Sequence, residues 1–538
     1  MYLCSGLGEK SRAADAIAYY FALSQKCLRN SFWNIHEIIE VRLPRQSGCL
    51  PTVLSYAHAF MAWHVPITRQ AGVPFSQARP TVKRIRMATP FFMTLLLHEK
   101  KLSNVKKLSE GMDLSYTLYN LMMHVGKTWF NIVKNRLFLC PSRKSKLIMF
   151  AEGQNRLLQT IHEKVGDCRK EIIWIHVASL GEYAVARPII RKIQSDNNLI
   201  ILTLFSPSAY EVLGERTGKK DEADKVFYLP WDTPENARQF LDIICPSKAI
   251  FIISEYWINY LRELGRRHIP TYFVSSLIPH NSYLVKWYAS PIRNAIPKST
   301  VFMVLDEGSK ENLNKMGFCN VTITGDPLFD NALDIAQTAY KDDIIERFCS
   351  TAKEGVLIAG SISDIKDLKI VCSYANSHRN IKCIFVPHEI SEEKLNEIKY
   401  HLDGWAELYS DCKPETDFSK RQVLIIDFIG ALSRIYRYGS WAYVGGGFSP
   451  YLHSVIEPVV YGLPVAFGPC VHRKITAQQM IDLGVGKMVR SAKEFSSWMD
   501  YLTSEKHEMT RIKQLATEYA RSNCGATKRV VQIINEEH

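Results

Sequence analysis

The sequence predicts an α/β protein made of two Rossmann-like domains that face a cleft. One observation is an alternation of apolar runs with helix-like segments between residues 172 and 264, and a second such alternation from about residue 355. This spacing is typical of a parallel, doubly wound sheet. The other observation is a turn of small residues directly after an apolar run in each half, at 178–182 and at 445–447. Open α/β sheets bind their ligands at such turns.

The first half is expected to hold four pairs of a strand and a helix. Each apolar run ends at small or polar residues, and the following segment carries apolar residues at helical spacing. The predicted strands are 172–177, 199–205, 225–229 and 249–253, and the predicted helices are 184–193, 209–214, 234–244 and 258–264.

The second half repeats the pattern after a boundary near 317–326. Its predicted strands are 355–359, 383–386, 422–426, 441–444 and 464–467, with helices between them and a charged, helical closing segment at 497–534. The predicted domains are therefore 171–322 and 323–538.

The chain before residue 171 has a different character. Residues 1–111 contain several prolines and no sustained hydrophobic period, so no fold is assigned to this leader. Residues 112–170 form a predicted helical segment in which apolar residues alternate with Lys127, Lys134 and Arg136. This pattern indicates a helix that lies on an anionic membrane surface. A helix packed on its own domain fits the same periodicity, so both interpretations stay open.

The composition excludes several protein classes. With 46% hydrophobic and 22% charged residues, a chain of 538 residues can build two or three cores, which argues against disorder. None of the 13 cysteines forms a C-x-x-C pair, so we expect neither a zinc knuckle nor a disulfide framework, and a reducing cytoplasm is the simpler setting. No run of eighteen apolar residues predicts a membrane-spanning helix. The net charge of +13 indicates an acidic partner, and by itself it leaves nucleic acid, anionic lipid and phosphorylated substrate open.

Two carboxylates are the candidate catalytic groups of the first half. Glu182 opens the helix after the first strand, and Glu255 follows the fourth strand. A carboxylate that projects into a cleft from a helix N-terminus suits a general base, although such a glutamate can equally serve only to complement the helix dipole. Two acids on one rim favour a functional role, because like charges placed together cost stability.

The candidate ligand site of the second half consists of three short segments at predicted strand ends and helix starts. Backbone amides at a helix start bind phosphate, and a nearby glutamate commonly holds ribose hydroxyls. The segments are Pro387-His388, Ile429-Gly430-Ala431 and Ser454-Val455-Ile456-Glu457.

At these residues the sequence resembles the 3-deoxy-D-manno-octulosonic acid (Kdo) transferases, which attach Kdo to lipid A. The Ser-x-Gly-Glu turn of that family is similar to 179–182, its Thr-Glu-x-Trp-Pro-Asn string to 254–259, and its Gly-Gly-Ser and Asn-x-x-Glu stretch to 445–457. Further matches lie at 206–208, 228–232 and 462–469, and the resemblance runs from about Met112 to the C-terminus.

The resemblance implies an inverting glycosyltransferase of GT-B type, with CMP-Kdo as donor and a lipid A precursor as acceptor. It implies a catalytic base at Glu182, CMP contacts at the three segments of the second half, and a position on the cytoplasmic face of the bacterial inner membrane, without nucleic acid as a partner. The sequence departs from the family pattern at His388, Ala431 and Ser454, where arginine, glutamate and asparagine are common, so backbone contacts to CMP are expected there.

Two further expectations concern a catalytic metal and the phosphates of the acceptor. We expect no cofactor and no catalytic metal, because the metal-binding D-x-D string of many sugar transferases is absent and one leaving phosphate needs less charge neutralisation. Basic residues of the first half are expected to face the acceptor's phosphates, namely Arg187, Lys192, Lys286 and Arg293.

Three hypotheses accompany this interpretation. Residues 1–111 precede the resemblance and are expected to be an upstream extension of the reading frame. A different cell-envelope sugar transferase on the same scaffold stays open, because fold does not fix function. A non-catalytic protein that binds a nucleotide or a membrane also stays open, because of the departures at positions 388, 431 and 454.

Overall fold

The computed structural model describes residues 114–137, 146–154, 156–219, 221–404, 406–449, 452–471 and 474–536. The expectations for residues 1–111 lie outside this part of the chain. The chain divides into two compact units, residues 1–151 and 152–538. The described part of the first unit begins with helix α6 (Leu114–Leu137), and α7 (Lys146–Gly153) ends just past the division.

Helix α6 confirms the helix predicted near residue 114. Two of its apolar side chains, Leu121 and Val125, are each 59% exposed. Within the described ranges, no helix has the length and apolar character that crossing a membrane requires.

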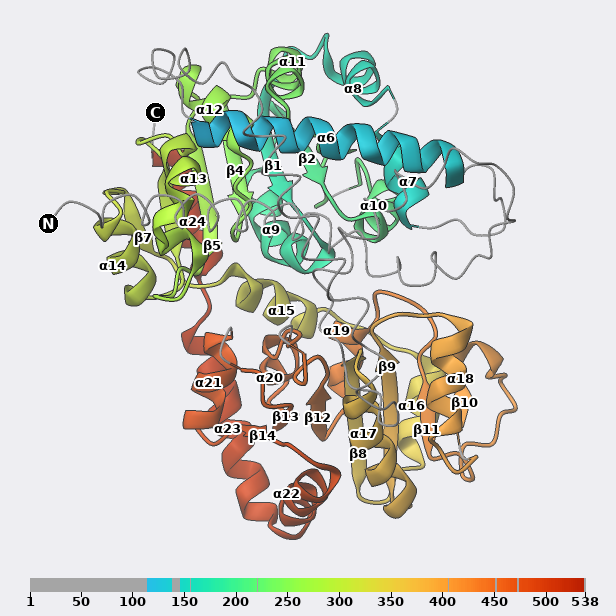
Figure 1. Cartoon of the computed structure of the whole chain (residues 1–538). Helices are drawn as coiled ribbons and strands as arrows, with labels where there is room; N and C mark the ends of the chain where they lie inside the picture. The colour runs from blue at the N-terminus through green and yellow to red at the C-terminus, as the bar shows by residue number, and fades with distance from the viewer. Residues whose placement is uncertain are drawn as a thin grey trace, which may run out of the picture. The chain divides into compact units, whose positions relative to one another are not determined.

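The second unit contains two parallel sheets, each with helices around it (Figure 1). In the first sheet the described residues form seven strands in the order β3-β2-β1-β4-β5-β6-β7. These strands are β1 (Glu171–Val177), β2 (Asn198–Leu204), β3 (Lys225–Tyr228), β4 (Lys248–Ile252), β5 (Thr271–Ser276), β6 (Val301–Val304) and β7 (Val321–Ile323). The helices that belong with them are α8 (Leu157–Val165), α9 (Leu180–Ile193), α10 (Pro207–Gly214), α11 (Pro234–Ile244), α12 (Ile258–Arg266), α13 (Ser290–Ala295) and α14 (Glu307–Lys315).

The second sheet also has seven strands among the described residues, in the order β10-β11-β9-β8-β12-β13-β14. The strands are β8 (Gly355–Ile362), β9 (Ile381–Pro387), β10 (Ala406–Leu408), β11 (Val423–Ile425), β12 (Trp441–Val444), β13 (Val465–Phe467) and β14 (Gly486–Met488). Its helices are α15 (Pro327–Gln337), α16 (Asp343–Ser350), α17 (Ile365–Ser377), α18 (Glu392–Tyr400), α19 (Leu432–Ile435), α20 (Ile456–Val460), α21 (Ile475–Asp482), α22 (Ala492–Ser504) and α23 (Lys506–Ser522), and one more helix, α24 (Ala526–Glu536), follows them in the chain.

The order of the strands locates the ligand-binding edge of each sheet. The direction of strand addition reverses between β1 and β4 in the first sheet and between β8 and β12 in the second. Open α/β sheets bind ligands beyond the carboxyl ends of the strands at such a reversal. The two turns of small residues in the sequence follow β1 and β12, so both lie at a reversal point.

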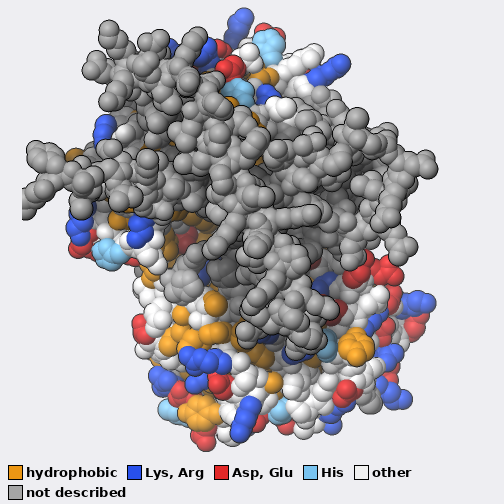
Figure 2. All heavy atoms as spheres, viewed as in Figure 1, with side chains coloured by type: hydrophobic (Ala, Val, Ile, Leu, Met, Phe, Trp, Pro, Cys, Tyr) orange, Lys and Arg blue, Asp and Glu red, His pale blue; other side chains and the backbone are white. Residues whose placement is uncertain are grey.

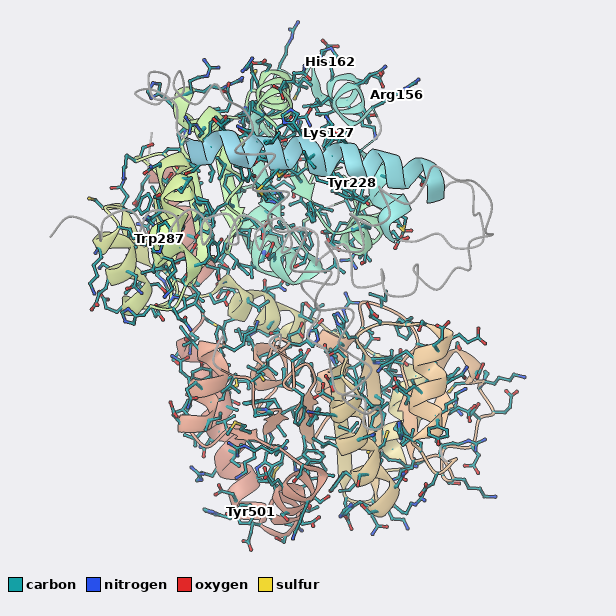
Figure 3. The ribbon with its side chains drawn as sticks, in the orientation of Figure 1. Lys127, Arg156, His162, Tyr228, Trp287 and Tyr501 are labelled. Carbon is teal, nitrogen blue, oxygen red and sulfur yellow. The ribbon has the colours of Figure 1, made fainter. Side chains whose placement is uncertain are left out.

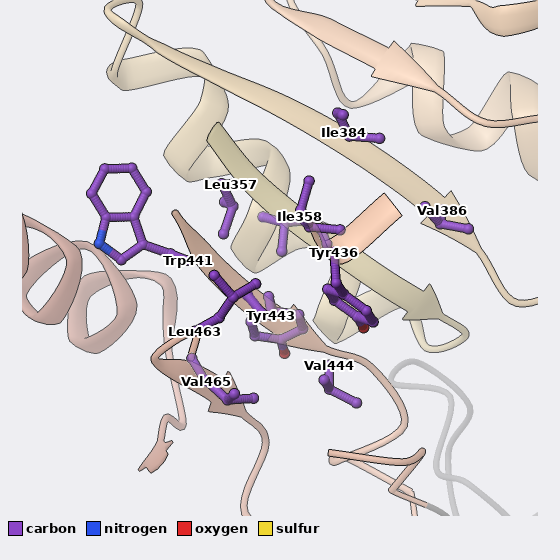
Figure 4. Packing of buried hydrophobic residues seen from close by; sticks show 14 of the residues in the cluster. Leu357, Ile358, Ile384, Val386, Tyr436, Trp441, Tyr443, Val444, Leu463 and Val465 are labelled. Carbon is purple, nitrogen blue, oxygen red and sulfur yellow. The ribbon is translucent and has the colours of Figure 1, made fainter. Parts of the chain in front are cut away.

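Strands buried on both faces read as nearly continuous apolar runs, which is why the central strands are mostly apolar. Figure 4 shows this packing in the second sheet, where side chains of β8 and β12 lie against Leu463 and Val465. Two aromatic residues in this core, Tyr436 and Tyr443, are almost fully buried.

The last helix belongs to the core of the first sheet. Val530 and Ile534 of α24 are buried in the cluster that covers β1, β2 and α9. The chain reaches this position by crossing back from the second sheet, and the crossing is fixed by Asp330 of α15, whose carboxylate accepts the N–H groups of Gly525 and Thr527 at 2.6 Å each.

Candidate functional site

Glu182 lies in the first turn of α9, at the β1 edge of the strand-order reversal. Its carboxylate accepts the backbone N–H of Ala178, and its own N–H donates to the hydroxyl of Ser179, the N-cap residue, at 3.4 Å. This arrangement is close to a capping box, in which an N-cap hydroxyl and a glutamate three residues later satisfy the free amides of a helix start. The side chain is half-buried, so it is not enclosed in the packed interior.

Glu255 follows β4, the strand that pairs with β1. It lies three residues beyond the end of that strand and is also half-buried. Because β1 and β4 are parallel neighbours, both carboxylates follow strand ends on the same edge of the sheet. As expected, Glu182 and Glu255 therefore follow the ends of two neighbouring strands on one edge of the sheet.

A buried hydrogen-bond network links the strands that lead to Glu182 and Glu255. The ring of His176 in β1 lies between Thr203 Oγ1, 2.9 Å from Nδ1, and the indole N–H of Trp257, 3.0 Å from Nε2. An indole N–H can only donate, so Nε2 of His176 is the acceptor and the proton sits on Nδ1. Burial agrees with this neutral form, because it lowers the pKa of His176 to about 3.

The same network joins three strand ends. Thr203 of β2 also accepts the indole N–H of Trp174 at 2.8 Å, and Phe205 packs on Trp257 with ring centroids 5.6 Å apart. Trp257 comes two residues after Glu255. The contacts of His176 therefore fix the segment that carries Glu255 against the strand that leads to Glu182.

The expectation that basic residues of the first half face acceptor phosphates is only partly consistent with the structure. Arg187 lies 3.3 Å from the buried carboxylate of Glu222, and the guanidinium of Arg293 donates to the carbonyls of Leu284 and Lys286 at 2.7 Å each. Both guanidinium groups are thus engaged within the protein. Two lysines, Lys192 and Lys286, have exposed side chains, and Trp287 next to Lys286 is 53% exposed (Figure 3).

In the second sheet, the glycine triplet after β12 has a structural requirement at each position. A Cβ on Gly445 would lie 2.2 Å from the carbonyl oxygen of Ser361, and one on Gly447 would lie 2.4 Å from the N atom of Gly468. Gly446 has a φ of +84°, which favours glycine. Its N–H donates to the buried carboxylate of Asp367 at 2.7 Å.

The predicted nucleotide-binding residues all lie at carboxyl ends of strands of the second sheet or at the helix start that follows. Pro387 ends β9, 429–431 follow β11, and 454–457 lead into α20 after β12. The structure therefore brings the three segments to one edge of one sheet, as the strand pairing predicts.

The side chains of these segments differ in what they can offer to a ligand. Those of Pro387, Ala431, Val455 and Ile456 are buried, so only their backbone can meet a ligand, whereas Ile429 is 63% exposed. The hydroxyl of Ser454 is buried without a hydrogen-bond partner among the described residues. Burial also raises the pKa of the Glu457 carboxyl to about 7.

Sequence reasoning missed three groups beside this edge. His453 contacts His388 with ring centroids 4.3 Å apart, Lys474 is the N-cap residue of α21, and the carboxylate of Asp367 accepts the N–H of Gly446. His453 directly precedes a predicted segment, which is a weak signal. Asp367 lies 86 residues before His453 and Lys474 lies 21 residues after it, so only the fold brings them together.

Two further observations concern metal and charge. Within the described ranges, no group of three or more His, Cys, Asp or Glu residues could hold a metal ion. Where described surface is visible in Figure 2, basic and acidic side chains are interspersed. The positive net charge therefore does not gather there into the single stripe that would favour nucleic acid.

Comparison with known proteins gives one family match. Residues 152–331 match the family described as 3-deoxy-D-manno-octulosonic-acid transferase (kdotransferase). A 3-deoxy-D-manno-octulosonic acid transferase of Aquifex aeolicus is 26% identical over 355 residues, which are 64% of this chain and 90% of that protein.

Two other similarities extend this match. A bifunctional glycosyltransferase/methyltransferase of Fusobacterium nucleatum is 23% identical over 412 residues, so the alignment covers 74% of this chain but only 61% of that protein. Among solved structures, a putative UDP-N-acetylglucosamine 2-epimerase from Listeria monocytogenes superimposes with a TM-score of 0.50 at 11% identity, over 69% of this chain and 98% of that one. This last similarity shows the fold alone.

Proposed function

We propose that this chain is a glycosyltransferase that moves Kdo from CMP-Kdo to a lipid A precursor with inversion at the anomeric carbon, which its similarity to the Kdo transferases supports. The observation that carries the proposal is the joint placement of Glu182 and the glycine triplet at the strand-order reversals of the two sheets. One reversal point offers a carboxylate, and the other offers backbone amides.

The proposed reaction needs both kinds of group. An acceptor hydroxyl attacks the anomeric carbon of Kdo and gives its proton to Glu182, while the bond from that carbon to the CMP phosphate breaks and CMP leaves with the bonding electrons. Glu255 on the neighbouring strand is proposed as a second acid on the acceptor side. The segments 387–388, 429–431 and 454–457 are proposed to bind CMP and to stabilise the departing phosphate.

Two features of the second sheet support a nucleotide there. The buried hydroxyl of Ser454 has no partner among the described residues, and an unpaired buried polar group costs free energy unless a ligand satisfies it. The carboxyl of Glu457, with its raised pKa, is suited to hydrogen bonding with sugar hydroxyls.

The decisive experiment is to incubate the purified chain with CMP-Kdo and a tetra-acylated lipid A precursor and to weigh the product. A mass increase by one or more Kdo residues supports the proposal and counts the sugars transferred. Release of CMP without a heavier lipid would contradict the acceptor. Turnover of UDP-sugars in place of CMP-Kdo would favour the alternative of another cell-envelope transferase.

The non-catalytic alternative rests on the substitutions at positions 388, 431 and 454. Of these, Ala431 has its side chain buried, where it offers a ligand no polar group. A protein of this kind would bind CMP without turning over CMP-Kdo, so the same assay separates the two functions.

We further propose that the protein works at the cytoplasmic face of the bacterial inner membrane, with α6 on an anionic bilayer. Support comes from Leu121 and Val125, which are exposed one turn apart on α6, and from Lys127 close by. The double change of Leu121 and Val125 to Asp should reduce cosedimentation of the full chain with phosphatidylglycerol vesicles by about tenfold or more, because it removes two apolar anchors and adds two repelled charges. Exposed Tyr400, changed to Asp, is the matched control and should leave cosedimentation unchanged.

A further inference from the structure

Two histidines contact each other beside the glycine triplet, and Lys474 is close enough to one of them, His453, to act on it electrostatically. His388 follows β9, His453 lies between the triplet and α20, and Lys474 is the N-cap residue of α21. The two imidazole rings are tilted by 35° with centroids 4.3 Å apart.

Backbone hydrogen bonds hold the two histidines at the strand-order reversal. The N–H of His388 donates to the carbonyl of Ile362, the last residue of β8, at 3.1 Å. The N–H of His453 donates to the carbonyl of Gly445, the first residue after β12, at 3.2 Å. Since β8 and β12 are the strands on either side of the reversal, the pair lies where an open α/β sheet binds its ligand.

The surroundings of His453 disfavour a positive charge on its ring while no anion is bound. Burial, followed by the smaller effects of the nearby His388 and Lys474, lowers the pKa of His453 to about 3. Burial also lowers the pKa of Lys474, whereas the carboxylate of Asp326 raises it. His453 is therefore neutral near neutral pH in the free protein.

Other charged groups around the pair come from two further helices. On α20, Glu457 has a carboxyl pKa raised to about 7 by burial. On α17, the carboxylate of Asp367 accepts the N–H of Gly446, and Lys366 Nζ lies 5.7 Å from the ring centre of Phe448. Asp326 faces Lys474, and residues 472 and 473 before Lys474 lie outside the described ranges.

We propose that His388 and His453 form a proton-dependent anion site, which binds the phosphate of a CMP ester together with Lys474 and takes up a proton when it does so. The inference rests on the proposed donor site and adds its regulation by pH. A bound phosphodiester carries a negative charge that favours protonated imidazole over neutral imidazole. One proton moves from solvent to the histidine pair on binding, and no covalent bond changes.

A histidine at position 388 differs in one respect from an arginine, which would stay charged at all working pH values. A histidine makes the same charge conditional on pH, since its unperturbed pKa is about 6.5. Anion affinity in this chain should therefore rise as pH falls, because the complex binds more protons than the free protein.

The test measures binding of the methyl ester of CMP to the full chain by calorimetry between pH 6 and pH 8. This probe is a phosphodiester and keeps one charge over the range, whereas CMP itself titrates with a second phosphate pKa of about 6. The dissociation constant is expected to increase with pH, by at most about tenfold per pH unit, the limit for uptake of one proton. Buffers of different ionisation enthalpy should report the uptake directly.

Variants separate the pair from other histidines. His388→Arg should keep the affinity measured at pH 6 and lose the pH dependence. His453→Gln should bind more weakly at pH 6 and should also lose the pH dependence. His378→Gln is the matched control, because His378 pairs with Asp500 at 3.0 Å on the far end of α17 and should not change the pH profile.

Each outcome bears on a different proposal. Binding that is independent of pH, or a pH dependence that survives in His388→Arg, would overturn the inference while leaving the donor site intact. Absence of binding at every pH would overturn the donor site as well. Binding that depends on pH without transfer of Kdo would support the anion site and contradict only the transferase function.

Discussion

At the scale of single residues, Glu182 combines an observed role in helix capping with the catalytic role proposed for it. Its carboxylate accepts the N–H of Ala178 at the start of α9, which is a helix-capping role, and it lies half-buried at the strand-order reversal, which is the place for a catalytic group. The two roles make different demands. Capping needs an acceptor oxygen, whereas a general base needs a group that can take a proton.

The change Glu182→Gln separates these roles. Glutamine keeps an acceptor oxygen for Ala178 but cannot serve as a base, so Kdo transfer should fall by about 10² to 10⁴, while the melting temperature and the affinity for CMP stay close to those of the parent. Initial rates with CMP-Kdo and calorimetric titration with CMP measure the two effects. Full turnover in this variant would mean that Glu182 serves only as a helix cap. Ser179→Ala provides the comparison, since losing the N-cap hydroxyl should cost about 1 kcal/mol of unfolding free energy.

How far the sequence predicts the site depends on the distance between the residues involved. Glu182 and its N-cap Ser179 are three residues apart, and the capping pattern can be read locally. The contact of His388 with His453 joins positions 65 residues apart through the pairing order of the second sheet, which local patterns do not contain. The three predicted segments 387–388, 429–431 and 454–457 were found because each follows a recognisable strand, but their side-chain burial follows from tertiary packing.

At the scale of elements, the predicted strands of both sheets are confirmed within a few residues. The exceptions are β5, β6 and β7 in the first sheet and β10 and β14 in the second, which the sequence analysis did not single out. Most of these are short strands of three or four residues at or near a sheet edge, and so short an apolar run gives little periodicity to read. The strand β5 is longer, and its sequence Thr-Tyr-Phe-Val-Ser-Ser ends in polar residues that resemble a loop.

The His176 network predicts how acid affects the first sheet. The pKa of His176 is lowered from its ordinary value of 6.5 to about 3, so between these values the unfolded chain binds more protons than the folded one. The stabilisation from neutral His176 is therefore fully present above about pH 6.5 and is lost as the pH falls toward 3. The unfolding free energy in urea, followed from pH 7 to pH 5, should decrease.

A variant assigns this acid sensitivity to one side chain. His176→Asn keeps hydrogen-bonding groups for Thr203 and Trp257 but does not titrate, so its unfolding free energy should depend less on pH than that of the parent. His176→Phe leaves the buried N–H of Trp257 unpaired and removes one of the two hydrogen bonds at Thr203 Oγ1, so it should cost about 1 to 3 kcal/mol at pH 7. An unchanged pH slope in His176→Asn would mean that other groups, such as His453, account for the effect.

The glycine triplet predicts a steric limit in the second sheet. In Gly445→Ala the new Cβ would lie 2.2 Å from the backbone oxygen of Ser361, which cannot move without disturbing the end of β8. We expect CMP binding to be lost and the unfolding free energy to drop by several kcal/mol, as for other overpacked sites. Gly181→Ala is the control for stability, because the nearest atom, Ser179 Oγ, is 3.8 Å away and alanine favours helix. Thermal unfolding of both variants checks the difference.

At the scale of the whole molecule, the chain crosses between the two sheets twice. Residues 324–326 lead from β7 to α15, and residues 523–525 lead from α23 back to α24. The crossings are joined by hydrogen bonds from Arg529 Nε to the carbonyl of Thr324 at 2.9 Å and from Gly525 and Thr527 to Asp330. From the sequence alone, the whole segment up to residue 538 is predicted to belong to the second domain, because the charged pattern of a surface helix does not say which sheet it covers.

The position of α24 makes a prediction that sequence order alone would not give. Ile534 is buried in the core of the first sheet, and the carbonyl of the same residue accepts from Lys248 of β4 at 2.9 Å. Ile534→Ala should therefore cost about 2 to 5 kcal/mol, and the loss of protection in hydrogen exchange should appear first in β1, β2 and α9, more than 300 residues earlier in the chain, and not in β8 or β12. Met499→Ala, in the core of the second sheet, is the matched control and should give the reverse pattern. Equal loss of protection in both sheets for both variants would mean that the two sheets unfold as one cooperative unit, so that the C-terminal helix stabilises them together.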